Sequence, residues 1–556
     1  MNMELQEVGK YSVEPFALER ILELELVKKT NEHSRFRVRG VLEEGEEERL
    51  IEESWEDKPV KLLEEGNVLF CGVAEDVGVI CENGVYYLEA EAVSWTVKLD
   101  KTEKKRSFQE KGLGYHSIAS QLASEAGGKA DCNAPEKQVS NLLLQYRETD
   151  WEFLKRLASH SNSVLVPDQT AAEPSFAFGA AEGKEYKDEA VRIGDFAVRK
   201  KVSRYRRLSQ AEEITYQEED AVEYTLRTDH AALEIGDYIN WKGKKLYVRE
   251  AFIHLKGSVF TCRYGLTTKT GLSAEKMVHP FISGLTLSGK VLKAEGDKVK
   301  VHLAIDAGQE ESKAYPFPYA TGYSADGHTG WYVMPEEGDT VEIVFPTEDE
   351  NDAYAVQSAR QEDTEKTADP KVKYLRTPDG KEIKLDKEEI LITANDNITY
   401  IKINEKNGVE IITDKEVQVT SGGSVTVASG DQISMMSKND FSIVSGKNLL
   451  VSAADSIAMV CKNNSLNLET PANGIEMSSS KPIKMQGGDA IDIAGDGKMT
   501  ITSGKAMQVT AKQNLEMASK KKMSLSASSS LEETCKASSI KMNGSIDLKG
   551  TMIKEN

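Results

Sequence analysis

The sequence predicts a mainly β protein that is built from several parts and ends in a long β-solenoid. Three observations lead to this prediction. Strand-like segments fill residues 10–100 and 190–270, a compact pattern of short strands fills 284–360, and apolar pairs recur every eight residues beyond residue 401. A chain of 556 residues is too long for one hydrophobic core, so we expect about three or four domains.

The first strand-rich part covers residues 1–275 and contains a helical insert at about 112–162. Segments such as RFRVRGVLEE and KKLYVREAFIHLKGSVFTCRYGL alternate apolar and polar residues, or run apolar between turn signals, which is typical of strands. Within the insert, Ile118, Leu122 and Ala126 are spaced four residues apart. This spacing places them on one face of a helix.

A second helix is predicted in the same insert. Thr149 and Glu152 have the spacing of a capping box, which starts a helix. The apolar residues that follow fall on one stripe of that helix, which we expect to be buried. They are Trp151, Leu154, Leu157 and Ala158.

The central part of the chain predicts a small β-barrel followed by a linker. Residues 284–360 contain the strand candidates GLTLSGKVLKA, KVKVHLAI, GWYVMP and DTVEIVFP, with Gly and Pro at the turns. Residues 361–385 predict a linker and hairpin. The polar segment QEDTEKTADP reads as the linker, and a Pro-Asp-Gly turn opens a hairpin over 377–394.

An octapeptide repeat occupies residues 386–556. Two apolar residues stand two positions apart, and a new pair starts every eight residues, so both members lie on one face of a short strand. Three positions later a Gly or Asp often appears, as at Gly422 and Asp414, where glycine would allow a positive φ and a sharp corner. One-residue slips at Leu466 and Ile475 fit the turns. The predicted core pairs in the clearest stretch are Val425/Val427, Ile433/Met435, Phe441/Ile443 and Leu449/Val451.

Two assemblies fit this repeat. One chain could take three octapeptides per coil, or three chains could wind about a common threefold axis and each supply every third strand. Three chains would also close the strand edges laterally, which suppresses edge-to-edge pairing. Either assembly is a stiff rod, and the trimeric form would be roughly 80 Å long at one strand spacing per octapeptide.

The net charge, the first residues and the cysteines limit the kinds of partner and the compartment that we expect. The net charge of −21 argues against binding along nucleic acid, because a polyanion repels a polyanion. The first residues, MNMELQEVGKYSVEPF, lack the basic-then-apolar pattern of a signal peptide, so we expect synthesis in the cytoplasm without one. The six cysteines show no CxxC or Cys/His ligand spacing and suit a reducing compartment.

Three motifs connect the chain to a known family. QYRETDWEFLKRLA at 145–158 closely resembles the QYRESDWDFLxRL signature of VgrG spike proteins of type VI secretion, and is similar to hub proteins of contractile phage tails. GWYVMPEEGDTVEIVF at 330–345 resembles the PExGDxVxVxF pattern of the spike's barrel. YLRTPDGKEIKLD at 374–386 resembles the start of the needle. The resemblance covers nearly the whole chain in the expected order.

The resemblance implies an architecture and a function. It implies a β-barrel hub with two barrel-like domains in residues 1–275, a neck barrel of the OB-fold type in 284–360, and a C-terminal triple-stranded β-helix needle formed by an intertwined trimer. A protein of this kind is a non-enzymatic homotrimeric hub–spike of a contractile injection system. It adapts a sixfold tail tube to a threefold needle that punctures a target envelope.

The expected partners and location follow from the same resemblance. They are two further copies of the chain, tail-tube, sheath and baseplate proteins, a PAAR-like tip protein or effector at the C-terminal end, and the target envelope in transient contact. The protein would be assembled into a phage-tail-like particle and delivered outside the cell or into a target. A type VI VgrG that carries effectors and a phage-tail or tailocin-like spike both remain open. A cell-wall hydrolase or an adhesin on a β-helical stalk is the rival class.

The sequence predicts no catalytic, cofactor-binding or metal-binding residues. Ser324, Asp326 and His328 are close in sequence, but a triad is recognised by geometry and these residue types also form turns. The residues of the family motifs are expected to act structurally, Glu148 in a buried ion pair or in hydrogen bonds between domains, and Glu336 with Asp339 in a tight turn. They are Gln145, Tyr146, Arg147, Glu148, Asp150, Trp151, Pro335, Glu336, Gly338 and Asp339.

Overall fold

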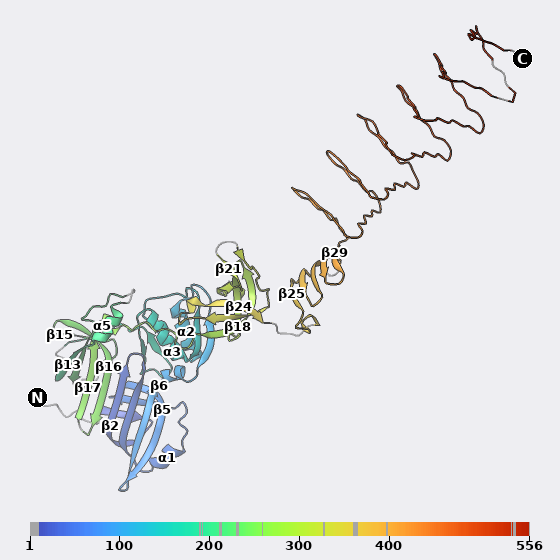
Figure 1. The fold of residues 1–556 in the computed structure, drawn as a ribbon. Coiled ribbons are helices and arrows are strands. Elements are labelled where there is room, and N and C mark those ends of the chain that lie inside the picture. The colour runs from blue at the N-terminus through green and yellow to red at the C-terminus, as the bar shows by residue number, and fades with distance from the viewer. Residues whose placement is uncertain are drawn as a thin grey trace. The chain divides into compact units, whose positions relative to one another are not determined.

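A computed structural model of the chain divides into two compact units, residues 1–420 and 421–556, which are described separately (Figure 1). None of the described helices is long and apolar enough to cross a membrane. The described residues are 10–187, 191, 193–210, 214–228, 233–257, 259–325, 329–359, 365–395, 398–534, 536–537 and 541–554.

A twelve-stranded sheet is the largest element of the first unit. Ten of its strands follow one hydrogen-bonded path. In spatial order they are β1 (Tyr11–Glu14), β4 (Pro59–Glu64), β5 (Asn67–Glu82), β6 (Val85–Ser94), β3 (Glu32–Leu42), β2 (Leu18–Lys29), β16 (Lys244–Lys256), β17 (Val259–Thr267), β14 (Val222–Thr228) and β13 (Asp195–Lys200). Off this path, β15 (Tyr238–Trp241) pairs with β16 and with β12 (Glu185–Tyr186).

The antiparallel pair β2–β16 joins the two strand-rich segments of the hub region into this one sheet (Figure 1). The two barrel-like domains expected in residues 1–275 therefore share a sheet. Alternating side chains from both segments, such as Leu24 on β2 and Ile253 on β16, enter one hydrophobic core, as the period of two in a strand requires. Two short helices, α1 (Glu46–Glu52) and α5 (Val202–Leu208), accompany the sheet.

The helical insert forms its own core beside the sheet. The residues predicted for the two helix stripes lie in or against this core, and the capping box of Thr149 and Glu152 is confirmed. Ala126 lies just past its helix as the C-cap. The elements of the insert are β7 (Lys104–Phe108), α2 (Tyr115–Glu125), β8 (Ala130–Cys132), β9 (Leu143–Glu148), α3 (Asp150–His160), β10 (Leu165–Pro167) and β11 (Phe176–Phe178), with the 3₁₀ helix η2 (Trp95–Asp100) before them.

A closed five-stranded barrel follows, as the sequence predicted for this region. The prediction of a strand at 330–335 is wrong, because strand pairing there ends at Gly330, and the barrel instead uses β20. We missed β20 because its two prolines cannot donate ladder hydrogen bonds and usually demote a strand. The barrel strands are β18 (Leu285–Glu295), β19 (Lys298–Leu303), β20 (Pro316–Ala320), β23 (Thr340–Phe345) and β24 (Tyr354–Ala359), and β21 (Ser324–Ala325) with β22 (Thr329–Gly330) forms a separate ribbon. Short 3₁₀ helices are η3 (Thr270–Leu272), η4 (Glu311–Lys313) and η5 (Glu350–Asp352).

An antiparallel five-stranded meander ends the first unit. The predicted turn at its start is present: the Gly380 N–H donates to the Thr377 carbonyl at 3.0 Å, and Gly380 has a φ of +79°. In the predicted linker, residues 361–364 lie outside the described residues, and η6 (Glu365–Thr367) follows them. The strands are β25 (Lys373–Arg376), β26 (Glu382–Leu385), β27 (Glu389–Asn395), β28 (Thr399–Asn404) and β29 (Gly408–Ile412).

Bends recur along the second unit with the predicted period. They begin at 414, 422, 430, 438, 446 and 454, eight residues apart, so the predicted corners are confirmed. The two one-residue slips are absorbed where predicted, because the bends at 462–464 and 471–473 are one residue longer than the others. Gly422 and Gly430 do not adopt a positive φ, so the expected reason for glycine at the corners is wrong. Between the bends the described backbone is unpaired after Ile412.

Candidate functional site: a buried polar junction under the motif strand

The QYRETDW motif spans a β-bulge and the start of a helix. Across the β7–β9 pair, Lys105 lies opposite Tyr146 and Lys104 lies opposite Glu148, which leaves Arg147 as the extra residue. Arg147 has a φ of +52°, in the left-handed region that costs a non-glycine residue energy. Its side chain is exposed and its guanidinium lies 5.8 Å from the Tyr146 ring centre. The bulge ends the strand so that helix α3 can begin three residues later.

Gln145 and Asp150 hold β7, β9 and α3 together. Both side chains are buried. The Asp150 carboxylate accepts hydrogen bonds from Lys104 Nζ at 2.6 Å, from Arg106 Nη2 at 2.5 Å and from Gln145 Nε2 at 3.0 Å. Gln145 Oε1 accepts in turn from Arg106 Nε at 2.7 Å. Asp150 is also the first residue of α3, where a carboxylate is stabilised by the helix dipole.

Trp151 connects the insert to the twelve-stranded sheet. Its indole N–H donates to the carbonyl of Asn31, in the turn between β2 and β3, at 3.2 Å. Its ring lies 4.8 Å from His33 and 5.7 Å, edge-on, from Phe176. Within one motif, Gln145 and Asp150 thus face β7, whereas Trp151 faces the twelve-stranded sheet.

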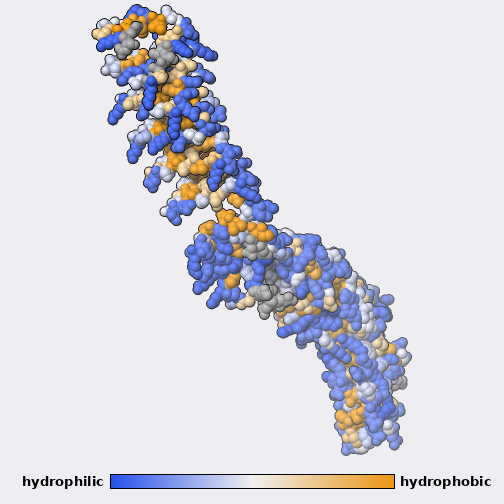
Figure 2. All heavy atoms as spheres, turned by 90° about the vertical axis from the view of Figure 1, so that its right-hand side faces the viewer, coloured by the Kyte–Doolittle hydropathy of each residue, from blue (hydrophilic) through white to orange (hydrophobic). Residues whose placement is uncertain are grey.

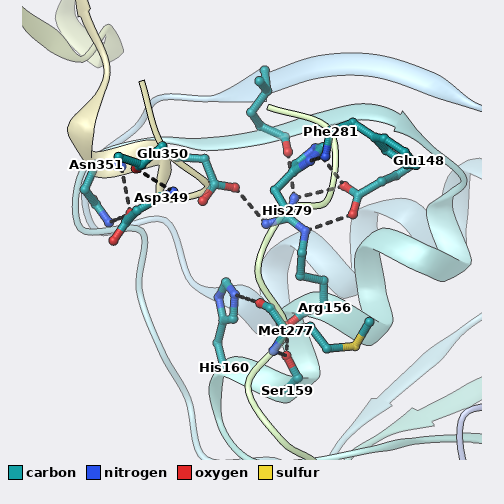
Figure 3. A network of polar contacts seen from close by, with 12 residues as sticks. Glu148, Arg156, Ser159, His160, Met277, His279, Phe281, Asp349, Glu350 and Asn351 are labelled. Atoms are coloured by element: carbon teal, nitrogen blue, oxygen red, sulfur yellow. Dashed lines mark hydrogen bonds and ion pairs between the residues drawn. The ribbon is translucent and has the colours of Figure 1, made fainter. Parts of the chain in front are cut away.

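Arg156 lies at the centre of a buried ion-pair network that connects the insert to the barrel (Figure 3). Its Nε and Nη2 each donate to the Glu148 carboxylate at 2.9 Å. Its Nη1 donates to Glu350 of η5 at 2.7 Å, and Nη2 also donates to the Leu144 carbonyl at 2.7 Å. Arg156, Glu148 and Glu350 are all buried. A buried guanidinium needs such partners, because an unpaired charge in the interior is costly.

The segment between the sheet and the barrel is fixed to the same helix. Met277 donates its N–H to Ser159 Oγ at 2.8 Å, and its carbonyl lies 3.2 Å from His160 Nε2 (Figure 3). His279 is fully buried, and its Nδ1 accepts from the Phe281 N–H at 3.2 Å. The proton of the neutral ring must therefore be on Nε2. That nitrogen lies 3.3 Å from Glu148 Oε2 without the geometry of a hydrogen bond.

The titratable groups of the network carry an unequal number of charges. Burial and the nearby Arg156 lower the pKa of His279 to about 3, so the ring is neutral at pH 7 in spite of its contact with Glu148. One arginine then faces two carboxylates. Burial raises the pKa of Glu148 against the opposing effect of Arg156, and the neighbouring Glu350 adds to the increase. The network therefore has a net negative charge when both carboxylates are ionised, and it takes up a proton more readily than an isolated ion pair.

Strand β9 also joins the two hydrophobic cores. Leu143 belongs to the core of the insert, whereas Leu142 and Leu144 belong to the core of the barrel. Polar contacts extend this joint, since the Asp306 carboxylate accepts from both the backbone N–H and the hydroxyl of Ser107 at 2.6 Å. The insert and the barrel are therefore joined by the side chains of residues 142–144, by a buried arginine and by the hydrogen bonds between Ser107 and Asp306.

The second motif forms a turn, as expected. The Asp339 N–H donates to the Glu336 carbonyl at 3.1 Å, and Asp339 Oδ2 accepts from the Glu336 N–H at 2.9 Å. Gly338, at a φ of +88°, donates to the Val291 carbonyl at 2.8 Å. Pro335 is buried, and Glu336 is exposed. The Asp339 carboxylate and the Glu336 backbone thus close a turn that pairs with β18.

The predicted needle-core pairs are exposed in the single chain. This holds for Val425, Val427, Ile433, Met435, Phe441, Ile443, Leu449 and Val451, whose exposed fractions range from 51% to 65%. Their burial as a core therefore stays a prediction that requires further chains. Of the three residues considered for a triad, Asp326 and His328 lie outside the described residues, as does the side chain of Ser324.

Sequence reasoning missed three members of the buried network: Arg156, His279 and Glu350. The signal for Arg156 was its place in the QYRETDWEFLKRLA motif, because the helical pattern puts it on the side of α3 opposite the predicted stripe. Glu350 lies in the segment EDENDAY, and nothing in the sequence pairs it with residue 156. Among the described residues, no group of three His, Cys, Asp or Glu side chains is placed to hold a metal ion.

Comparison with known proteins gives the class of protein that this chain is similar to. Residues 399–551 match a family described as "Uncharacterized protein conserved in bacteria (DUF2345)". Among solved structures, the E. coli c3393 protein, described as a type VI secretion component similar to the T4 bacteriophage tail proteins gp27 and gp5, has a TM-score of 0.47 at 11% identity, over 63% of this chain and 100% of that one. No curated protein matches.

Two further solved structures belong to the same classes. The Francisella PdpA–VgrG complex in its half-lidded form has a TM-score of 0.44 at 11% identity, over 70% of this chain and 83% of that one. The 43 kDa tail protein of prophage MuSo2 from Shewanella oneidensis has a TM-score of 0.37 at 10% identity, over 48% and 98%. These structures are of VgrG and phage-tail proteins, which are the classes that the sequence motifs resemble.

Proposed function

We propose that the chain is the hub–spike of a contractile injection system, acting as a homotrimer and without enzymatic activity. In this role residues 1–275 adapt a sixfold tail tube to threefold symmetry, residues 284–360 form the neck, and residues 386–556 form a needle that punctures a target envelope. The order of the three sequence motifs supports the assignment of these parts.

The exposed apolar pairs of the needle segment carry this proposal. From Val409/Ile411 to Met523/Leu525 there are fifteen pairs, and every member is between 48% and 77% exposed in the single chain. Hydrophobic side chains are visible along this unit in Figure 2. A soluble monomer rarely exposes a contiguous apolar surface of more than a few hundred Å². Covering half of an aliphatic side chain stabilises by on the order of 1 kcal/mol, so the whole row strongly favours association.

Three chains can supply that cover with the geometry described. The unpaired extended segments between bends offer free N–H and C=O groups, which need partners when the apolar pairs are buried. Strands from two further copies would satisfy both needs and leave no lateral edge. The proposed product is a rod whose activity is mechanical, with a PAAR-like tip protein or an effector as the partner at its C-terminal end.

The test is the mass and shape of the purified protein. We expect light scattering to give about three times the chain mass of 61.4 kDa, and electron micrographs to show a threefold needle on a wider ring. A mass near 61.4 kDa would refute the trimer. A muramidase assay on the same preparation tests the rival class, and turnover that a point mutation abolishes would overturn the non-enzymatic assignment.

A further inference from the structure

The meander β25–β29 has one face on which aliphatic residues predominate. Because its strands are in register, these residues line up in two continuous rows across the sheet. We call this surface the aliphatic face. One row is Leu375, Ile383, Ile392, Ile401 and Ile411, and the other is Leu385, Ile390, Ile403 and Val409.

The aliphatic face is the exposed one. Its side chains are all between 39% and 68% exposed. The opposite face contains most of the charged residues of the meander, with Leu391 and Ile412 among them. Glu382 on it is only 6% exposed and is paired with Arg376 at 3.0 Å and with Lys366 at 2.6 Å. A sheet with one solvated face normally turns the polar side to water. The reversed arrangement indicates that a partner covers the aliphatic face.

Sequence continuity identifies that partner as further copies of this chain. Val409 and Ile411 end the two rows, and they also belong to the octapeptide register, eight residues before Val417 and Val419. The pairs and the rows therefore form one apolar series along the chain, and chains that cover the pairs reach the rows. The one charged strand residue on this face, Lys373, stands opposite Leu385 on the edge strand β25, so the two aliphatic rows themselves meet without repulsion between like charges.

The meander can fix the alignment of the chains along the needle, because it occurs once per chain and the repeat does not. Away from its two one-residue slips, the period of eight lets one chain slide past another by one octapeptide and bury a similar set of pairs. The meander occurs once per chain, so its rows match those of other copies in one alignment only. We infer that the aliphatic faces of three meanders pack together and set the register in which the needle winds. This inference rests on the proposed trimer.

Cysteine accessibility tests the packing without disturbing the fold. Ile411 on the aliphatic face and its neighbour Glu410 on the other face are similarly exposed in the single chain, at 62% for Ile411 and 51% for the Glu410 side chain. We expect Ile411→Cys in the purified trimer to react with a maleimide at least tenfold more slowly than Glu410→Cys. The exposed Cys81 and Cys461, together with Cys535, are replaced by serine in both variants. Equal rates in the trimer would refute the packing.

Cross-linking tests the register. A chain with Met435→Cys forms a disulfide with its own copies when the chains are in register, and a mixture with Ile443→Cys chains reports a slip of one octapeptide. We expect mixed 435–443 disulfides to be rare in the parent protein and to rise several-fold with Ile392→Thr and Ile401→Thr, which keep the preference for strands. The control is Lys384→Thr with Lys402→Thr on the polar face, where no rise is expected.

The outcomes separate this inference from the proposed function. A monomeric parent protein would overturn the trimer and the inference with it. A trimer in which the threonine variants keep the same disulfide pattern as the control would overturn the register role alone. Loss of the trimer in the threonine variants, with the control still trimeric, supports the inference, because it shows that the aliphatic face is needed for assembly.

Discussion

Replacing Arg156 with methionine should destabilise the first unit strongly. The side chain is 1% exposed and makes two hydrogen bonds to Glu148, one to Glu350 and one to the Leu144 carbonyl. Methionine fills much of the volume but leaves two buried carboxylates and a carbonyl without their donor. Breaking a buried ion pair costs about 3–5 kcal/mol, and with two stranded carboxylates we expect a loss near 5 kcal/mol.

The control is a surface arginine that also contacts two glutamates. Arg49 contacts Glu46 at 2.7 Å and Glu53 at 3.0 Å, but its side chain is 40% exposed. Exposed pairs contribute about 0–1 kcal/mol, so Arg49→Met should cost less than about 1 kcal/mol. Urea unfolding followed by tryptophan fluorescence measures both variants, and hydrogen exchange of Leu143–Glu148 locates the effect. An Arg156→Met loss no larger than that of Arg49→Met would refute the reasoning.

A rescue separates charge from shape. Arg156→Met combined with Glu148→Gln and Glu350→Gln removes the charges while keeping the size of the side chains. Replacing all members of a buried ionic group with neutral ones is often close to neutral in stability. We expect the triple variant to unfold within about 2 kcal/mol of the parent protein. If the triple variant is as unstable as Arg156→Met, the loss comes from packing and the electrostatic argument is wrong.

Three further predictions concern single residues. Burial lowers the pKa of His279 to about 3, so the folded protein keeps this ring neutral, whereas the unfolded chain binds a proton below the ordinary pKa of 6.5. The free energy of unfolding therefore falls as the pH falls, and between pH 7.5 and 4 the parent should lose about 3 kcal/mol more than His279→Asn. Parallel curves of unfolding free energy against pH would contradict this. Arg147→Gly should leave stability unchanged or raise it by up to about 1 kcal/mol, because glycine relieves the left-handed strain, and a clear loss of thermal stability would show that the side chain matters. Gly338→Ala should cost about 1–2 kcal/mol since its φ is +88°, whereas Gly430→Ala, without a positive φ, should be neutral in the same thermal melt.

The sequence predicted elements well where one local pattern decides the structure. The capping box placed α3, the octapeptide period placed the corners of the second unit, and the Pro-Asp-Gly turn placed the start of the meander. The prediction failed for β20, whose prolines argue against a strand, and for the strand at 330–335, where aromatic and β-branched residues remain exposed outside the barrel ladder.

The candidate site was only half predictable. Glu148 was expected in a buried ion pair or in hydrogen bonds between domains, and it is ion-paired. Its partner Arg156 lies eight residues further along the chain, and Glu350 lies almost two hundred residues away, at a separation that only the tertiary fold can close. Local periodicity contains no information about such pairs. The same is true of His279, whose buried state depends on contacts with α3 and with Glu148 rather than on its neighbours in sequence.

Strand β9 has a mechanical consequence. Its alternating leucines are embedded in two cores at once, so the insert and the barrel cannot rotate against each other without pulling one leucine row out of its packing. This shared packing leaves no hinge between the insert and the barrel. If the chain acts as the proposed spike, a compressive load that enters through the insert would be passed on to the barrel with little bending at this joint.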